Sequence, residues 1–390
     1  MALSKGYMNL EQIQRDEILR RREFPVVSHT IYLAHSAVCP LPACVRDAIG
    51  RFAADCVNGD QEDFIPTNLL QDTRQLAAKM IGAQMNEIAL VGPTSLGLSF
   101  IAQGIDWQSG DNIIVNGDDY PSNVYPWMAL EEKGVQLRHL KPEEPGRIEP
   151  EDIFRLVDSR TRMAALSSCH YVSGCRINID KIGCELRSRN VLVCVDGIQT
   201  VGAFPTPVEH VDFLAADAHK WMLGPCSSGI LYVKQAAQER LKPVVQGWHN
   251  LSCPDFIAQE TLNYKPDSRR YEAGTANLLG IIGHRASLAM LNDVGVDKIA
   301  ADLLSKRKFI VPKLLAKGYE VMHPEVGLEN ASGIVTFNKK GENMAALAEQ
   351  LGQSGIKVSL RVMREGSKFI RLSPHFYNTD TELDRLLEEL

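Results

Sequence analysis

The sequence predicts an α/β fold in which a large domain is built around a mainly parallel sheet and a smaller α+β domain follows it. Short apolar runs rich in β-branched residues alternate with segments of helical periodicity, which is the pattern of strand-helix-strand crossover units. The pattern changes after residue 288, where a long helix precedes strands and another helix. We therefore expect an N-terminal arm that joins the small domain (1–30), a large domain (31–288) and a small domain (289–390).

The composition is that of an ordinary globular protein. The chain has 390 residues, of which 45% are apolar and 23% charged, and its formal net charge is −6. No basic field that would recruit nucleic acid is present, and no apolar run reaches the length of a membrane span. We therefore expect neither nucleic-acid nor membrane partners and place the protein in the cytoplasm.

Helices are expected where apolar residues recur at helical spacing. Residues 69–81 show this spacing, and Thr94 or Ser95 follows a Gly-Pro turn at a position suited to the N-cap of a helix that runs to about residue 105. The other expected helices cover residues 11–24, 41–52, 299–316 and 344–352.

Strands are expected at the short apolar runs. The runs 191–195 and 213–216 matter most for function, because a carboxylate or an amine follows each of them. The other expected strands cover residues 87–91, 112–115, 163–166, 229–233 and 333–337, with two more near Val358 and Phe369.

The nine cysteines favour reduced thiols over disulfides or a metal centre. Their number is odd, and no two form the C-x-x-C pair that zinc and redox sites commonly use. We expect mostly buried thiols and no bound metal.

The strongest functional signal is an acid and a lysine that follow two of the expected strands. Asp196 comes directly after the run 191–195, and Lys220 lies shortly after 213–216. The carboxyl ends of parallel strands meet at one edge of a sheet, where open α/β sheets bind ligands. An acid that faces a ring nitrogen and a lysine that can form a Schiff base are the two groups that pyridoxal 5′-phosphate requires. The pair therefore predicts this cofactor.

Five further residues fit contacts to the same cofactor. Thr94 and Ser95 open a helix after a strand, where free backbone N–H groups and the helix dipole favour a phosphate. His219 would add a side-chain donor to that phosphate, and Gln199 would reach the ring hydroxyl. Tyr120 would stack on the ring through its aromatic face. Each residue taken alone also fits an ordinary turn, cap or surface position, so the interpretation depends on their occurring together.

Motifs spread over most of the chain support this interpretation. They are Tyr32-Leu33, Glu87-Ile88, Pro93-Thr94-Ser95, the segment 120–127, Asp196-Gly197-Ile198-Gln199, the segment 219–225, Gly247-Trp248, and the segments 270–277 and 371–379. From about Ile31 to Leu390 the chain thereby resembles the class V aminotransferases, a family in the fold-type I group of pyridoxal phosphate enzymes. The Tyr-Pro-Ser-Asn and His-Lys-Trp segments look more like its isopenicillin N epimerase-like and selenocysteine lyase-like branches than like its cysteine desulfurases.

The resemblance assigns the cofactor contacts residue by residue. It implies Lys220 as the Schiff-base residue, Asp196 on the ring nitrogen and Gln199 on the ring hydroxyl. Thr94 and His219 are implied as ligands of the phosphate.

The resemblance also implies contacts to the substrate and to a second subunit. Arg371 would hold the carboxylate of an amino-acid substrate at two points. His170 and Tyr171 lie at a position that faces the cofactor in the family. His375 is a further candidate near the substrate, although a histidine in its setting is more often a packed structural residue. A homodimer is implied, in which Thr275 reaches the phosphate of the neighbouring active site.

Departures from the family pattern narrow the activity. Cysteine desulfurases carry a nucleophilic cysteine shortly before the C-terminal arginine, whereas residues 358–369 contain none and Cys253 is the last cysteine of the chain. They usually stack a histidine where this chain has Tyr120, and they place a serine where it has Asp217. We expect Asp217 to point away from the phosphate or to pair with a cation. Sulfur transfer through a cysteine persulfide is therefore not expected.

We expect an enzyme that acts at the Cα of an amino acid, with Lys220 as the base because burial beside cationic groups lowers its pKa. A transaminase or an epimerase is the primary expectation. The alternative within the class is a C–S or other β-lyase without a catalytic cysteine. A non-catalytic pyridoxal phosphate-binding or regulatory protein, or an interaction protein with a relic pocket, is the alternative outside it. Arg361 and Arg364 lie where substrate-contacting loops often run, or are simply solvated.

Overall fold

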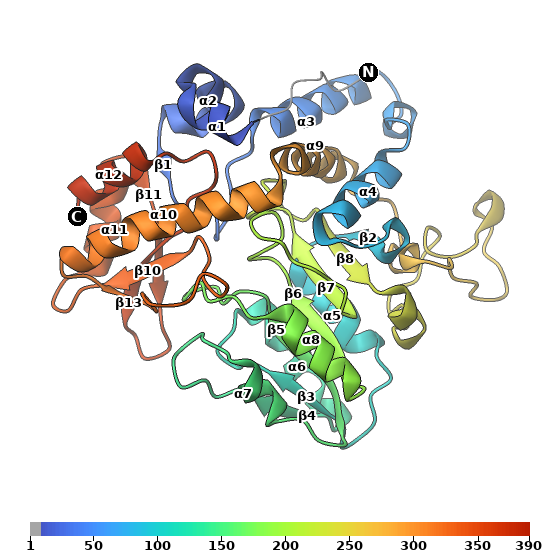
Figure 1. Cartoon of the computed structure of the whole chain (residues 1–390). Helices are drawn as coiled ribbons and strands as arrows, with labels where there is room; N and C mark the ends of the chain where they lie inside the picture. Colours follow the sequence, from blue (N-terminus) through green and yellow to red (C-terminus); the bar gives the residue numbers. More distant parts are fainter. Residues whose placement is uncertain (1–8) are drawn as a thin grey trace.

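The computed structural model describes residues 9–390, so residues 1–8 of the expected N-terminal arm lie outside it (Figure 1). The largest sheet has seven strands in the order β2-β8-β7-β6-β5-β3-β4. Their bounds are Ile88–Val91 (β2), Asn112–Val115 (β3), Gln136–His139 (β4), Thr161–Ser167 (β5), Leu192–Asp196 (β6), Phe213–Asp217 (β7) and Gly229–Val233 (β8).

The seven-stranded sheet is mainly parallel, as predicted. Adjacent strands run parallel from β7 through β6, β5 and β3 to β4. Only β8 is reversed, and it pairs antiparallel with both β2 and β7. The ends of β6 and β7 that carry the expected site residues therefore meet at one edge of the sheet.

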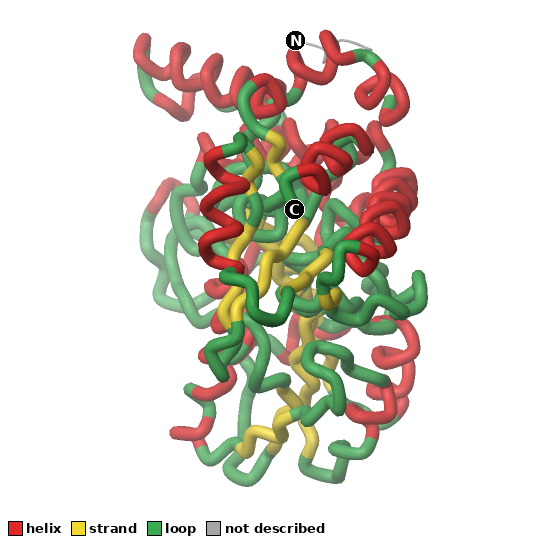
Figure 2. The backbone as a smooth tube through the Cα atoms, turned by 90° about the vertical axis from the view of Figure 1, so that its left-hand side faces the viewer, coloured by secondary structure: helices red, strands yellow, loops and turns green. Residues whose placement is uncertain are grey.

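Helices cover both faces of this sheet (Figure 2). Alternate residues of each strand enter opposite cores: Val193 and Val195 of β6 join one cluster, whereas Leu192 and Cys194 join the other. The first cluster includes residues of α4 (Leu69–Ile81), α8 (Ile179–Ser188) and α9 (Leu278–Val294). The second includes residues of α5 (Thr94–Gly104) and α6 (Tyr125–Met128). The central strands β3, β5, β6, β7 and β8 are thus covered on both faces, as their continuous apolar runs require.

A second sheet of four antiparallel strands, in the order β12-β13-β10-β9, forms the C-terminal part. Its own apolar core includes residues of three helices. The bounds are Glu320–Val321 (β9), Val335–Asn338 (β10), Ser359–Val362 (β12), Lys368–Leu372 (β13), Val296–Ala316 (α10), Met344–Gln353 (α11) and Asp380–Glu388 (α12). The expected boundary at residue 288 falls inside α9, and the division into domains stays a prediction.

The N-terminal segment packs on this C-terminal part. Strand β1 (Ile31–Tyr32) pairs in parallel with β11 (Ile356–Lys357). The single helix expected at residues 11–24 is two helices, α1 (Leu10–Arg15) and α2 (Glu17–Glu23), because Asp16 leaves the helical conformation and caps α2 through the N–H of Leu19. The two remaining α-helices of residues 9–390 are α3 (Ala43–Asp55) and α7 (Pro150–Phe154).

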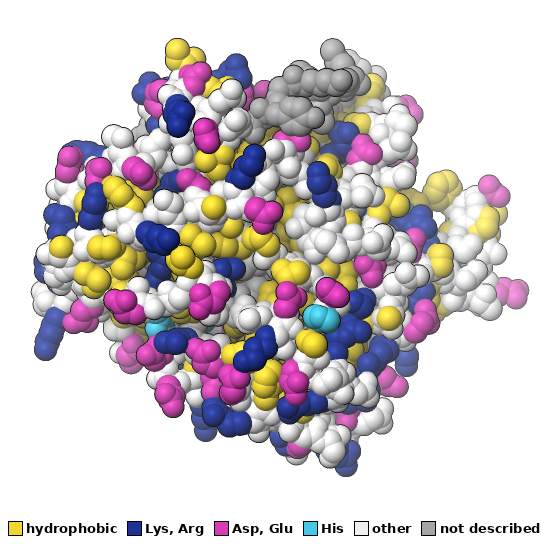
Figure 3. All heavy atoms as spheres, viewed as in Figure 1, with side chains coloured by type: hydrophobic (Ala, Val, Ile, Leu, Met, Phe, Trp, Pro, Cys, Tyr) yellow, Lys and Arg dark blue, Asp and Glu magenta, His cyan; other side chains and the backbone are white. Residues whose placement is uncertain are grey.

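Two further expectations concern the surface and the thiols. Charged side chains of both signs are interspersed on the face shown in Figure 3, and within residues 9–390 no helix combines the length and apolarity needed to cross a membrane. All nine cysteines are free. Only four of them, Cys39, Cys169, Cys175 and Cys194, are buried, which is fewer than expected.

Candidate active site

Lys220 and Asp196 lie at the same edge of the seven-stranded sheet. Asp196 is the last residue of β6 and pairs with Ala215 of β7, and Lys220 lies three residues beyond the end of β7. Both side chains are buried, with residue exposures of 3% and 6%. The Asp196 carboxylate accepts a hydrogen bond from the N–H of Ile198 at 3.0 Å. The strand ends thus bring together the two groups that the sequence singled out.

Burial and charge shift both groups. Burial lowers the pKa of Lys220, the positive charges of Arg371 and Arg361 lower it further, and Asp196 opposes them. The pKa of Asp196 is raised by burial and by the charge of Asp119, whereas Lys220 opposes the shift. The lysine shift has the expected direction, and it favours a neutral amine able to accept a proton.

Tyr120 lies against the lysine. Its ring centroid is 5.2 Å from Lys220 Nζ, and its ring meets that of Tyr171 edge to face at 5.4 Å. Its exposure of 41% places it at the open side of the site. The loop is held by Asp119, which accepts the N–H of Tyr120 at 2.7 Å and the side-chain amide of Asn123 at 3.0 Å. Tyr120 therefore has a free aromatic face beside the lysine.

The loop that carries the lysine is organised by Asp217. Its two carboxylate oxygens accept the backbone N–H groups of Ala218, Ser227 and Ser228 at 2.9 to 3.1 Å. His219 donates from Nδ1 to the same carboxylate at 2.7 Å. Burial raises the pKa of Asp217, but these hydrogen bonds and His219 outweigh burial and lower it. The Asp217 carboxylate thus binds the backbone N–H groups of its own loop and the His219 side chain.

Helix α5 opens beside this loop with free donors. Pro93 occupies the N-cap position, so Thr94 is the first helical residue and not the cap that the sequence suggested. No side chain caps the helix. Thr94 Oγ1 accepts the N–H of Asp217 at 3.0 Å and keeps its own proton to donate, and Ser95 Oγ lies 2.8 Å from Ser122 Oγ. The uncapped helix start and the Thr94 hydroxyl form a suitable cradle for a phosphate.

Gln199 is buried behind Asp196 with its side chain fixed. Its Oε1 accepts the indole N–H of Trp221 at 2.8 Å, and its Nε2 donates to the carbonyl of Ser36 at 3.1 Å. One amide hydrogen is left to donate. This geometry fits a contact to a ring hydroxyl.

Arg371 is a fully buried cation on β13 with most of its donors unused. Its residue exposure is 0%, and its only hydrogen bond among the described residues runs from Nη1 to the carbonyl of Tyr171. Nε and Nη2 are buried without a partner. Burial and the nearby charge of Arg361 hold the pKa of Arg371 well below its ordinary value. Burying a guanidinium with unused donors is energetically unfavourable, so the site is suited to bind an anion such as a carboxylate.

The two candidate histidines have no free ring nitrogen. His170 accepts the N–H of Ser173 at Nδ1 (3.2 Å), and its Nε2 lies 3.2 Å from the carbonyl of Asp118. His375 accepts the N–H of Phe376 at Nδ1 (2.9 Å) and donates to the carbonyl of Trp221 (3.0 Å). In each histidine both ring nitrogens already have a partner, so neither residue has a nitrogen free for a direct hydrogen bond to substrate. The geometry supports structural roles for both residues.

Thr275 is exposed and lies on the segment between β8 and α9. Tyr171 contacts both Tyr120 and Arg371. Asp119, which contributes to the electrostatics at Asp196, was missed by the sequence analysis. The signal for Asp119 was available, because it follows the end of β3 much as Asp196 follows a strand.

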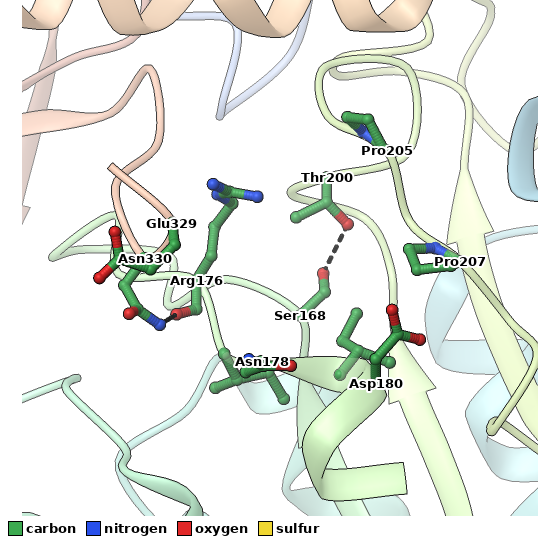
Figure 4. A pocket seen from close by; sticks show the side chains of 11 residues that line it. Ser168, Arg176, Asn178, Asp180, Thr200, Pro205, Pro207, Glu329 and Asn330 are labelled. Carbon is green, nitrogen blue, oxygen red and sulfur yellow. Dashed lines mark hydrogen bonds between the residues drawn. The ribbon is translucent and has the colours of Figure 1, made fainter. Parts of the chain in front are cut away.

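A separate cavity of about 190 Å³ lies nearby (Figure 4). Its wall includes Ser168 and Thr200, whose hydroxyls are 2.8 Å apart, and Ser168 donates to the backbone carbonyl of Asp196 at 3.0 Å. Neither Lys220 nor Arg371 lines it. The cavity therefore adjoins the main chain behind Asp196 and is distinct from the lysine site.

The residues present fit pyridoxal phosphate. An uncapped helix start suits its phosphate, the buried carboxylate of Asp196 suits a protonated ring nitrogen, and a buried lysine of lowered pKa suits its aldehyde. Such a lysine, on a loop after a strand of a mainly parallel seven-stranded sheet, defines the class of fold-type I pyridoxal phosphate enzymes. The chain belongs to the Aminotransferase class-V family, which it matches over residues 31–386. Its cofactor is accordingly pyridoxal 5′-phosphate.

Similar proteins agree with this assignment. A probable cysteine desulfurase from Methanothermobacter thermautotrophicus is 28% identical, with 95% of this chain and 96% of the relative covered. An apo cysteine desulfurase from Thermococcus onnurineus NA1 has a TM-score of 0.86 at 22% identity over 94% of this chain and 95% of its own. A cystine C–S lyase in complex with its product cysteine persulfide has a TM-score of 0.84 at 20% identity over 94% and 98%. The two structures share the fold, and the named activities favour the C–S lyase alternative over a transaminase or an epimerase.

Proposed function

We propose that this protein cleaves the Cβ–S bond of a sulfur-containing L-amino acid by β-elimination and releases the sulfur product directly. The observation that carries the proposal is the β12–β13 hairpin, which leads to Arg371 and whose residues 359–372 include no cysteine. The hairpin itself therefore offers no thiol to receive sulfur as a persulfide, and Cys169, whose charge acts on Arg371, is a buried thiol. The names of the similar proteins supply the bond that is broken.

The proposed roles of the cofactor-binding residues follow the geometry above. Lys220 attaches the cofactor, Asp196 faces its ring nitrogen, and Gln199 donates to its ring hydroxyl. The remaining contacts are proposed for the phosphate (Thr94, Ser95 and His219) and for the ring face (Tyr120).

When bound, pyridoxal phosphate supplies an electron sink for the negative charge that develops at Cα. Arg371 holds the substrate carboxylate with its free Nε and Nη2 donors and orients the Cα–H bond. Lys220, as the neutral amine, takes the Cα proton. The Cβ–S bond then breaks, and the sulfur leaves with the bonding electron pair and is protonated. Overall, R–S–CH₂–CH(NH₃⁺)–COO⁻ and water give R–SH, pyruvate and ammonium.

We further propose that the protein is a homodimer. The segment between β8 and α9 protrudes from the molecule (Figure 1) and exposes the large apolar side chains of Trp248, Phe256, Ile257 and Leu262. A contiguous exposed apolar segment of this kind is typical of an interaction surface. Thr275 lies at the exposed end of the same segment, from which it would reach the neighbouring subunit's phosphate site.

The product mixture tests the proposed reaction. Holoenzyme is incubated with L-cysteine or L-cystine, and sulfide or persulfide, pyruvate, ammonium and alanine are quantified. Pyruvate and ammonium in a ratio of about 1:1, as the stoichiometry above requires, support elimination. Alanine as the main product would instead establish a desulfurase, and formation of the D-enantiomer or of a pyridoxamine form would establish an epimerase or a transaminase. Any of these last three outcomes overturns the proposal.

A further inference from the structure

The segment 33–39 joins the C-terminal sheet to the lysine loop. At one end, the carbonyl of Leu33 accepts the backbone N–H of Ser373, which directly follows β13, at 2.8 Å. At the other end, the N–H of Cys39 donates to the carbonyl of His219 in the lysine loop at 2.7 Å. One short backbone segment therefore contacts both parts of the candidate site.

The hydroxyl of Ser373 holds this segment at Ser36. It accepts the backbone N–H of Ser36 at 3.0 Å and the hydroxyl of Ser36 at 2.7 Å, and it donates its own proton to the carbonyl of Leu33 at 3.3 Å. A serine hydroxyl has one proton and two lone pairs, so all three are used. Both serines are buried. Breaking the pair would leave buried polar groups without partners, which makes Ser36 a fixed point of the segment.

The peptide bond that follows Ser36 points its carbonyl at Gln199. The N–H of this peptide, which belongs to Ala37, donates to the carbonyl of Ala34 at 2.9 Å. Because a trans peptide is planar, the carbonyl of Ser36 points in the opposite direction. There it accepts a hydrogen bond from Nε2 of Gln199 at 3.1 Å. The anchored position of Ser36 thus determines where the Gln199 amide finds its acceptor.

Gln199 depends on this acceptor for its alignment. Its Oε1 accepts the indole N–H of Trp221 at 2.8 Å. That bond alone would leave the amide free to turn, because the terminal torsion of a glutamine side chain has broad energy minima. The second bond, to the carbonyl of Ser36, fixes the amide plane and with it the direction of the remaining N–H.

We infer that Ser373 is a positioning residue, which acts through Ser36 on Gln199 and so aligns the hydrogen bond that Gln199 donates to the cofactor's ring hydroxyl. A donor at this oxygen favours the form of the lysine-bound cofactor that carries more negative charge there. Loss of the alignment should therefore make the lysine-bound cofactor hold its proton to a higher pH. The inference rests on the proposed contact between Gln199 and the ring hydroxyl, but not on which bond of the substrate is cleaved.

Spectrophotometric pH titration of the holoenzyme tests the inference without substrate, because the absorption of lysine-bound pyridoxal phosphate changes with its protonation. Ser373→Ala should raise the midpoint of this titration by an amount that corresponds to an about 3- to 10-fold higher proton affinity, as expected for one misaligned hydrogen bond. Ser36→Ala keeps the backbone N–H of Ser36 and should give a smaller shift in the same direction. Ser268→Ala is the matched control, because it also removes a buried, hydrogen-bonded hydroxyl, and it should leave the midpoint unchanged. The variants all retain the charged groups that act on Lys220, which are Asp196, Asp217, Arg361 and Arg371.

A double-mutant cycle separates positioning from a general effect on folding. Gln199→Ala should raise the midpoint by itself, and the addition of Ser373→Ala should raise it no further, because the two residues act through one hydrogen bond. If Ser373→Ala does not retain the cofactor, Ser36→Ala takes its place in the cycle.

Two results of the cycle would overturn the inference alone. Additive shifts would show that Ser373 acts independently of Gln199, and an unchanged midpoint in the serine variants beside a shifted one in Gln199→Ala would show that the alignment does not need the serine pair. Both results leave the Gln199 contact in place. An unchanged midpoint in Gln199→Ala would instead refute both that contact and the inference.

Discussion

Asp217→Asn offers a direct measure of how strongly the lysine loop depends on one carboxylate. The side chain accepts four hydrogen bonds, from His219 Nδ1 and from the backbone N–H groups of Ala218, Ser227 and Ser228. In the asparagine variant one oxygen still accepts two of these hydrogen bonds. The NH₂ group replaces the other oxygen and cannot accept the remaining two. Two hydrogen bonds to a charged acceptor are lost, each worth about 1.5 to 3 kcal/mol, so we expect a loss of about 3 to 6 kcal/mol in unfolding free energy.

The assay is urea unfolding of the apoprotein, followed by tryptophan fluorescence with Trp221 buried next to the loop. For a chain of this size the expected loss moves the unfolding midpoint by about 1 M urea. Asp293→Asn, an exposed carboxylate, is the control and should stay within about 0.5 kcal/mol of the wild type. Equal midpoints for the two variants would refute the assigned role of Asp217.

The pH dependence adds an independent check. The folded-state pKa of Asp217 lies below its ordinary value of 3.8. The unfolded chain therefore binds more protons between the two pKa values, and the stabilisation is present above pH of about 4 and lost as the pH falls through the folded-state value. The gap between wild type and Asp217→Asn should shrink on acidification from about pH 6 to about pH 3. A gap that is constant over this range contradicts the electrostatic account.

Three further predictions concern other contacts. Lys220→Ala should abolish borohydride-reducible attachment of the cofactor and lower kcat by at least about 10³-fold, as expected for loss of the base. Peptide mass mapping checks the attachment and product assays check kcat. Preserved turnover would refute the assignment of Lys220 as the base. Tyr120→Leu should weaken cofactor binding about 5-fold, because it removes an aromatic stacking contact worth about 1 kcal/mol, whereas Tyr120→Phe keeps the ring and should not weaken binding. Equal affinities of the two variants in a fluorescence titration would contradict the stacking role. Arg20→Met should lower the free energy of unfolding by about 3 to 5 kcal/mol, because it leaves the Glu382 carboxylate buried without its ion-pair partner. The control is Arg21→Met, which changes an exposed arginine. Equal urea midpoints for the two variants would show that the buried pair contributes nothing to stability.

The fold was predictable where side-chain patterning and burial coincide. The strands at 112–115 and 229–233 and the helix at 69–81 have the expected bounds, because their apolar residues face a core on both sides or on one helical face. Strand β4 (Gln136–His139) was missed because it is a partly exposed edge strand without an apolar run. The reversed direction of β8 also left no trace in the sequence, since a buried strand has the same composition in either direction.

The site was predictable only as far as the ends of neighbouring strands determine it. Asp196 and Lys220 follow parallel strands, so their proximity follows from sheet topology. The unpaired donors of Arg371 depend on the packing of a second sheet, which residue spacing did not reveal. The engagement of both nitrogens of His170 and His375 likewise arises from tertiary contacts.

Arg371 lies on β13 of the four-stranded sheet, whereas Lys220 lies on the loop that follows β7 of the seven-stranded sheet, and this has a mechanical consequence. The loop at 170–176 connects them, since Arg371 donates to Tyr171 and Thr336 Oγ1 donates to the carbonyl of Val172 at 2.5 Å. Any sliding of one sheet against the other would change the spacing between the Lys220 amine and the Arg371 guanidinium. Substitutions at this seam, remote from the reacting atoms, should therefore alter which lengths of substrate the enzyme accepts.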